Sequence, residues 1–104
     1  ILAVEGIDGI YVGPSDLGLS MGYEPTLDPS APEVIEAIGA IVRRARAAGR
    51  IAGIHTGSTA MIRRMQAQGF HFATLLTDVR ILASALAGHL AELNDTTAQT
   101  VASY

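Results

Sequence analysis

Three short apolar segments, each followed by a stretch with helical spacing, constrain the fold of this chain more than any other feature. The apolar segments are residues 6–12, 51–55 and 70–76. None of them alternates strictly between apolar and polar side chains. Nearly continuous apolar strands are typical of a parallel sheet that is covered on both faces. The pattern therefore predicts an α/β fold in which parallel strands are joined by helices.

Two helices are predicted between these strands. The first has the capping-box pattern Ser-Ala-Pro-Glu at its start, with Ser30 as the cap and Pro32 in the first turn, and Gly49 ends it. The second spans about residues 58–68 and ends at Gly69, because glycine readily adopts the left-handed conformation that terminates helices.

A third helix is predicted after the last strand, with Asp78 as its N-cap and residue 93 as its end. From residue 94 to residue 104 the composition turns polar. We therefore expect a folded segment over residues 1–93 and a C-terminal tail over residues 94–104. The residues expected to line one face of the first two helices are Val34, Ile38, Ile41, Ala45, Met61, Ile62 and Met65. The third helix carries apolar residues at helical spacing, namely Val79, Leu82, Leu86, Leu90 and Leu93.

A sheet of only three parallel strands has two open edges. Natural domains avoid such edges because they expose unpaired backbone groups, and 104 residues bury only a small core. The chain also begins at Ile1, directly on an apolar stretch. We therefore expect the C-terminal three βα units of a larger α/β fold, namely an incomplete (β/α)8 TIM barrel. The alternative is a small α/β domain that stands alone.

Composition and charge exclude several functions. The chain has no cysteine, which excludes disulfides, thiolate metal sites and cysteine nucleophiles. Its net charge of -3 and its aromatic content of 5% give no support for nucleic-acid binding, which needs clustered cations and stacking side chains. No apolar run is long enough to span a membrane, and the start lacks the pattern of a signal peptide. We expect a soluble, cytoplasmic protein without nucleic-acid or membrane partners.

Polar residues occur at the carboxyl ends of the predicted strands, where parallel α/β folds bind their ligands. Asp16, His55 and Asp78 lie at three successive strand ends. A carboxylate there suits a hard cation such as Mg²⁺ or Mn²⁺. The backbone amides of Ser15 and Asp16 open a short helical turn that suits carboxylate or phosphate oxygens. Each residue also has a structural alternative: Asp16 as a turn cap, Asp78 as a helix cap, which we favour, and His55 as a hydrogen-bonded wall residue.

The stretch Gly-Ile-Tyr-Val-Gly-Pro-Ser-Asp-Leu at residues 9–17, with Ser-Met-Gly-Tyr at residues 20–23, resembles the HpcH/HpaI aldolases. Weaker similarity at residues 48–54 and 69–72 extends the resemblance over most of residues 3–93. This family cleaves 4-hydroxy-2-oxo acids, including 2-keto-3-deoxy sugar acids, to pyruvate and an aldehyde. The resemblance implies a (β/α)8 barrel that uses a divalent metal ion (Mg²⁺, Mn²⁺ or Co²⁺). It also implies a homo-oligomer in which the last helix packs with a neighbouring subunit.

The resemblance also assigns roles to residues at the first strand end. Asp16 matches the family's metal-binding aspartate, and the amides of Ser15 and Asp16 match those that hold the pyruvate carboxylate. The substrate-binding residues implied are Gly13, Pro14, Ser15 and Asp16. The family's metal-binding glutamate and its catalytic arginine and histidine match positions before Ile1, so the catalytic residues are unknown within this chain. His55 is the one candidate that the chain itself offers.

Two positions depart from the family pattern. His55 stands where many members carry an aliphatic residue. Leu76 stands where many carry glycine, and its side chain would narrow the pocket. These departures leave the exact substrate open, although not the class of reaction.

The expected function is that of a segment of a metal-dependent, class II aldolase that releases pyruvate. Because the metal acts as the electron sink, no Schiff-base lysine is needed, and the chain contains no lysine. Two alternatives stay open. One is a citrate-lyase-like enzyme that acts on a CoA thioester, and the other is a catalytically inert, truncated α/β module. The isolated 104-residue chain is expected to be inactive.

Overall fold

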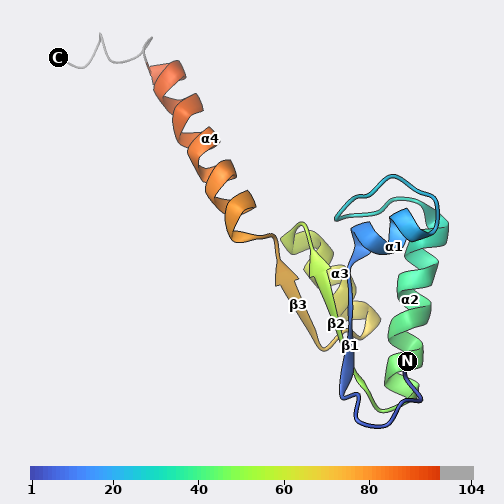
Figure 1. Cartoon of the computed structure of the whole chain (residues 1–104). Helices are drawn as coiled ribbons and strands as arrows, with labels where there is room; N and C mark the ends of the chain where they lie inside the picture. The colour runs from blue at the N-terminus through green and yellow to red at the C-terminus, as the bar shows by residue number, and fades with distance from the viewer. Residues whose placement is uncertain (97–104) are drawn as a thin grey trace.

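The computed structural model of the chain describes residues 1–96 and contains one sheet of three parallel strands with helices (Figure 1). The strands lie in the order β1-β2-β3, so each strand pairs with the next one along the chain. This arrangement confirms the predicted parallel α/β fold. The elements are β1 (Gly9–Val12), α1 (Pro14–Ser20), α2 (Pro32–Ala47), β2 (Ile51–Thr56), α3 (Thr59–Gln68), β3 (Phe72–Leu75) and α4 (Asp78–Thr96).

The hydrophobic core lies on one face of the sheet. Val12, Ala52 and Ile54 project from this face and pack with buried residues of α2 and α3. The ten buried core residues are Val12, Val34, Ile38, Val42, Ala45, Ala52, Ile54, Met61, Met65 and Phe70. Both helices therefore cover the same face of the sheet.

The opposite face of the sheet, which we call the open face, is not covered by any helix of the described residues. It is formed by Gly9, Tyr11, Ile51, Gly53, His55, Phe72 and Thr74, which alternate with the core residues along the strands. The side chains of Tyr11 and Phe72 are 52% and 48% exposed. The expectation of a sheet covered on both faces is therefore wrong within residues 1–96.

The start of α2 differs from the capping-box prediction. The residue that precedes the helix is Ala31, in an extended conformation, and no side chain caps the helix. Ser30 lies one residue too early to serve as the N-cap, whereas Pro32 is the first helical residue as predicted. On the core face, Ile41 is half-buried, while Val42, one position further, is 1% exposed.

The predicted boundaries of α3 are confirmed. The hydroxyl of Ser58 accepts a hydrogen bond from the backbone N–H of Met61 at 3.1 Å, as expected for an N-cap. Gly69 ends the helix in the left-handed conformation, with φ of 102°. Met61 and Met65 are buried, whereas Ile62 is half-buried.

The N-cap of α4 is Thr77 and not Asp78. The carbonyl of Thr77 accepts a hydrogen bond from the N–H of Ile81 at 2.9 Å, and its hydroxyl accepts one from the N–H of Arg80 at 3.3 Å. Asp78 is the first helical residue, and its carboxylate reaches only the N–H of Val79, at 2.8 Å. The side chain of an N-cap residue accepts from the amide two or three residues after it, and here only the hydroxyl of Thr77 does so.

Helix α4 extends away from the sheet (Figure 1). Its apolar stripe consists of Val79, Leu82, Leu86, Leu90 and Leu93, each between 54% and 70% exposed. The stripe therefore does not pack against the core of the described residues. The helix continues beyond residue 93 to Thr96, and the rest of the predicted tail, residues 97–104, lies outside the described residues. Among the described helices, none is long and apolar enough to cross a membrane.

Candidate functional site

The three parallel strands end at the same edge of the sheet, which we call the carboxyl rim: residues 13–16, 56–58 and 76–78. Asp16 lies in the first turn of α1, and Asp78 begins α4. His55 is the second-last residue of β2 and lies next to the rim. The three predicted site residues therefore occur at one end of the sheet. Within residues 1–96, however, no three histidine or acidic side chains gather closely enough to hold a metal ion by themselves.

The carboxylate of Asp16 folds back over Gly13. A Cβ atom placed on Gly13 would lie only 2.7 Å from Oδ2 of Asp16, so glycine leaves room for the carboxylate in this position. No side chain caps α1, whose N-cap is Gly13, and the exposed Asp16 carboxylate accepts no hydrogen bond from the described residues. The alternative in which Asp16 serves as a turn cap is therefore not supported.

The first turn of α1 also offers unpaired backbone donors. Pro14 is the first helical residue and is buried, which fixes the direction of the turn. The N–H of Leu17 donates to the carbonyl of Gly13 at 2.9 Å and closes the first turn. The amides of Ser15 and Asp16 precede it and have no acceptor within the helix. Together with the Asp16 carboxylate, they form a compact polar corner at the rim.

His55 takes part in a hydrogen-bonded group on the open face. Its Nδ1 atom lies 2.8 Å from the hydroxyl oxygen of Thr74, and the same hydroxyl is bonded to the phenol of Tyr11. Tyr11 is stacked on Phe72 with ring centroids 5.9 Å apart. Of these residues, only His55 was predicted from the sequence as a site residue, whereas Tyr11 and Thr74 were not. Successive side chains of a strand point to opposite faces of the sheet, so the register of the paired strands places all three residues on one face.

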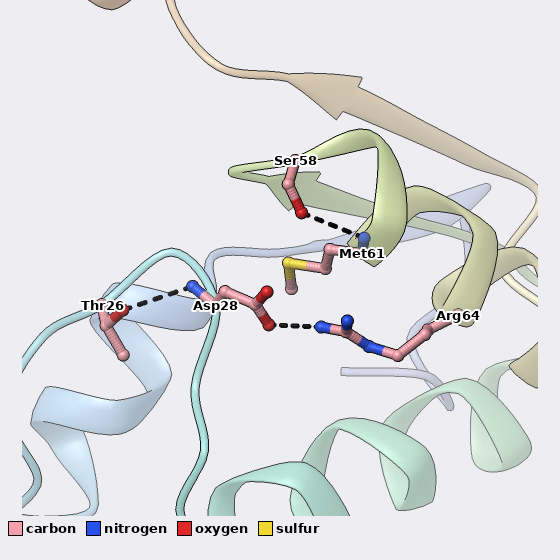
Figure 2. Close-up of polar contacts among 5 residues, drawn as sticks. All are labelled: Thr26, Asp28, Ser58, Met61 and Arg64. Atoms are coloured by element: carbon pink, nitrogen blue, oxygen red, sulfur yellow. Dashed lines mark hydrogen bonds and ion pairs between the residues drawn. The ribbon is translucent and has the colours of Figure 1, made fainter.

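The segment between α1 and α2 is tied to α3 by an ion pair, which Figure 2 shows. Oδ1 of Asp28 lies 2.5 Å from Nη2 of Arg64. The N–H of Asp28 donates to the hydroxyl of Thr26 at 3.3 Å, which fixes the local turn. Both members of the pair are partly exposed, so the pair contributes little stability and mainly fixes the position of the segment.

The same segment lies against the carboxyl end of β2. A Cβ atom placed on Gly57 would lie 2.9 Å from Cβ of Leu27. Gly57 is followed by Ser58, whose capping hydroxyl starts α3 beside the ion pair (Figure 2). Leu27 of this segment therefore lies against the carboxyl rim at Gly57.

Tyr23 anchors the beginning of this segment. Its N–H donates to the carbonyl of Gly18 at 2.9 Å. A hydrogen bond to Glu33, reinforced by desolvation and by the charge of Glu33, raises the pKa of Tyr23 above its usual value of 10.0. The contact joins the α1–α2 segment to the start of α2.

Leu76 has an unusual backbone at the end of β3. Its φ of 52° makes it the only non-glycine residue of the described chain in the left-handed region. The N–H of Leu76 donates to the carbonyl of Thr56 at 2.8 Å, which holds this conformation against the end of β2. Glycine adopts such a backbone without a steric penalty, whereas leucine does not.

Comparison with known proteins identifies related sequences along most of the chain. The family model described as HpcH/HpaI aldolase/citrate lyase matches residues 1–85. A hydroxypyruvate/pyruvate aldolase of Rhizorhabdus wittichii is 44% identical over 85 residues, which are 82% of this chain and 34% of that protein. A 2-keto-3-deoxy-L-rhamnonate aldolase of Klebsiella pneumoniae is 38% identical over 99 residues, which are 95% of this chain and 36% of that protein.

Solved structures show the same arrangement of elements. An HpcH/HpaI aldolase/citrate lyase family protein from Burkholderia cenocepacia superimposes with a TM-score of 0.81 at 33% identity, covering 90% of this chain and 36% of that one. An HpcH/HpaI aldolase from Desulfitobacterium hafniense gives a TM-score of 0.79 at 26% identity, covering 89% and 36%. The chain thus spans about a third of the length of the relatives that it matches.

Proposed function

The chain belongs to the HpcH/HpaI aldolase/citrate lyase family, and we propose that it forms part of a carbon–carbon lyase that cleaves a 4-hydroxy-2-oxo acid to pyruvate and an aldehyde. The observation that carries this proposal is the polar corner at the carboxyl rim, where a free carboxylate on Asp16 lies beside two unpaired amides. The names of the curated relatives, which are aldolases for 2-oxo acids, support the same class of reaction.

We further propose that this chain forms the C-terminal three βα units of a (β/α)8 barrel. In a barrel the helices form an outer ring and the inner face of the sheet is filled by side chains from all strands. The present sheet has the same two-sided arrangement, because α2 and α3 cover one face while the open face carries exposed aromatic side chains. The chain also spans only about a third of its relatives. The remaining strands would continue from the free edges of β1 and β3.

A divalent cation fits the residues at the rim. The carboxylate of Asp16 is a hard oxygen donor with no partner in the described chain, and ions such as Mg²⁺, Mn²⁺ or Co²⁺ are held by carboxylates together with substrate oxygens and water. One acidic side chain is too few for a complete site, so we place a second ligand outside residues 1–96. When bound, the cation supplies Lewis-acid stabilisation of the negative charge that develops as the carbon–carbon bond breaks.

The chain's own residues would bind and orient the pyruvate half of the substrate. The amides of Ser15 and Asp16 donate to its carboxylate, because first-turn amides of a helix are suited to anionic oxygens. Gly13 leaves room for the Asp16 carboxylate, and the buried Pro14 holds the turn in place. Leu76 lies at the end of β3 on the same rim, where its side chain would reduce the space available to the substrate. Acid–base catalysis would come from residues outside this chain.

The alternative CoA-thioester lyase is less well supported. Recognition of a nucleotide with several phosphates generally uses arginine or lysine side chains. The residues of the carboxyl rim include neither. The rim instead offers one free carboxylate and two free amides, which match a small 2-oxo acid.

We propose that α4 packs against a neighbouring subunit in a homo-oligomer. Its five stripe residues are more than half exposed, and a helix face of this kind is costly to leave in water. Replacing Leu86 and Leu90 with glutamate should lower the oligomeric mass in light scattering. Unchanged mass would contradict this role of α4.

The proposed function is tested by measuring pyruvate release. The complete protein that carries this segment is incubated with 4-hydroxy-2-oxo acids, and pyruvate is detected through a coupled dehydrogenase. We expect turnover with Mn²⁺, Mg²⁺ or Co²⁺ that a chelator abolishes. Absence of turnover with every acid and metal, or full turnover with the chelator present, would contradict the proposal.

A further inference from the structure

Three polar side chains from three different strands are joined by hydrogen bonds on the open face. Thr74 of β3 is the register partner of His55 in β2, and their side chains meet at 2.8 Å. Tyr11 of β1 is paired with Gly53 of β2 and reaches across that strand to the hydroxyl of Thr74. The resulting series runs from the phenol through the threonine hydroxyl to the imidazole.

The absence of a side chain at Gly53 makes this series possible. A Cβ atom on Gly53 would lie 2.2 Å from Cζ of Phe72, so the Phe72 ring occupies the space above the glycine. Tyr11 stacks on that ring, with an angle of 12° between the ring planes. The stack holds the phenol over β2 and directs its hydroxyl to Thr74. Gly53 and Phe72 therefore fix the position of Tyr11.

The chemistry of the three groups determines the direction of the hydrogen bonds. The threonine hydroxyl has one proton, so it donates to one neighbour and accepts from the other. A phenol is the most acidic donor of the series, and a neutral imidazole nitrogen is its most basic acceptor. We therefore assign the order in which Tyr11 donates to Thr74 and Thr74 donates to Nδ1 of His55. In the reverse order, the phenol proton would lack an acceptor among residues 1–96.

This order fixes the state of the histidine. With Nδ1 as an acceptor, neutral His55 carries its proton on Nε2. Nε2 has no partner in the described part of the chain. His55 also lies one residue before the end of β2, beside the carboxyl rim. A donor with a fixed orientation is therefore available beside the carboxyl rim.

We propose that Tyr11 and Thr74 are positioning residues that hold His55 as its Nε2–H tautomer, so that Nε2 donates a hydrogen bond to an oxygen of the 2-oxo acid bound at the rim. The tautomer depends only on the contacts of the open face. The hydrogen bond to the substrate rests on the proposed function. The two parts are therefore tested by different measurements.

The tautomer is measured by ¹⁵N NMR on histidine-labelled complete protein, at a pH at which its histidines are neutral. Neutral histidine in water already favours the Nε2–H form, so we expect His55 to be in this form almost completely, with Nδ1 unprotonated. We expect Thr74→Val to lower the fraction of this tautomer toward that of a free histidine, while Thr74→Ser keeps it. His71 is an internal control, because its Nδ1 accepts a hydrogen bond from the N–H of Ala52 at 3.0 Å and should not respond. A proton on Nδ1 of His55 in the unmodified protein, or an unchanged tautomer in Thr74→Val, would overturn the proposal.

The substrate contact is measured by a double-mutant cycle on kcat/KM for pyruvate release. His55→Ala and Thr74→Val should each lower kcat/KM by about tenfold, the worth of one hydrogen bond. The double variant should be no worse than His55→Ala, because Thr74 acts through His55. If the losses of kcat/KM in the two single variants multiply in the double variant, the positioning role of Thr74 is refuted. It is also refuted if Thr74→Ser loses as much kcat/KM as Thr74→Val. If the unmodified protein releases no pyruvate, the proposed function fails, and the NMR result still decides the tautomer.

Discussion

Replacing Leu76 with glycine tests whether the backbone at the end of β3 is strained. Leu76 has a φ of 52°, and the hydrogen bond from its N–H to the carbonyl of Thr56 holds it there. Its side chain is half-buried. The substitution therefore has two opposing effects on stability. It removes the strain of the left-handed backbone, which stabilises the protein, and it removes a partly buried side chain, which destabilises it.

Alanine at the same position separates these two effects. An L-residue in the left-handed conformation costs about 1–2 kcal/mol, and glycine avoids this cost but loses roughly 0.5–1 kcal/mol in the greater freedom of the unfolded chain. Half-burial of the leucine side chain is worth about 1 kcal/mol. Leu76→Ala loses the side chain and keeps the strain, so we expect it to be about 1 kcal/mol less stable than the original protein. Leu76→Gly should lie within about 0.5 kcal/mol of the original protein.

The free energy of unfolding of the complete protein and of both variants is measured by urea denaturation under identical conditions. The decisive quantity is the difference between the glycine and alanine variants, because both lack the leucine side chain. A glycine variant that is more stable than the alanine variant by about 0.5–1 kcal/mol supports the account. Equal stability, or a more stable alanine variant, would show that position 76 is not held in the left-handed region.

Three further predictions concern the open face, the α1–α2 segment and the isolated chain. Gly53→Ala should lower the free energy of unfolding in urea by about 1–3 kcal/mol, because the added methyl group clashes with the ring of Phe72. Phe72→Leu in the Gly53→Ala protein should recover part of this loss. A neutral effect of Gly53→Ala would contradict the packing of Phe72 over Gly53. Because the pKa of Tyr23 is raised in the folded protein, its neutral form contributes stability that is present below pH 10 and is lost as the pH rises through the folded-state pKa. An absorbance titration should therefore show one phenol that ionises late, and Glu33→Gln should return the pKa of this phenol toward 10.0. An unchanged pKa in Glu33→Gln would mean that the hydrogen bond is absent. The 104-residue chain alone should aggregate or form oligomers and release no pyruvate with excess metal, and a cooperative, active monomer would be inconsistent with this view.

Local sequence patterns predict much of the fold because they act over a few residues. The three apolar segments identify the parallel strands, and Ser58 and Gly69 mark the ends of α3 through hydrogen bonds and backbone conformations that depend on their immediate neighbours. The prediction of an N-cap fails where two suitable residues are adjacent in the sequence. Thr77 and Asp78 both suit an N-cap, and only the actual course of the backbone selects Thr77.

Features that depend on contacts beyond the immediate neighbours are less accessible from sequence. The apolar spacing of α4 indicates a buried face but does not say what covers it, and the stripe is exposed in the described chain. The polar corner at Asp16 lies where the strand pattern places it, because the turn is local. The contact of Tyr11 with Thr74, by contrast, spans 63 positions and depends on the register of three strands. Only the three-dimensional arrangement reveals that His55 has a fixed neighbour.

The most direct test of the central claim is to measure Mn²⁺ binding and pyruvate release on the same preparation of the complete protein with Asp16→Ala. Asp8→Asn serves as a control, because Asp8 is an exposed carboxylate that precedes β1 at the opposite end of the sheet. The account predicts that Asp16→Ala loses calorimetric Mn²⁺ binding and metal-dependent pyruvate release together while its circular dichroism is unchanged, and that Asp8→Asn retains both. Undiminished Mn²⁺ binding and pyruvate release in Asp16→Ala would contradict it.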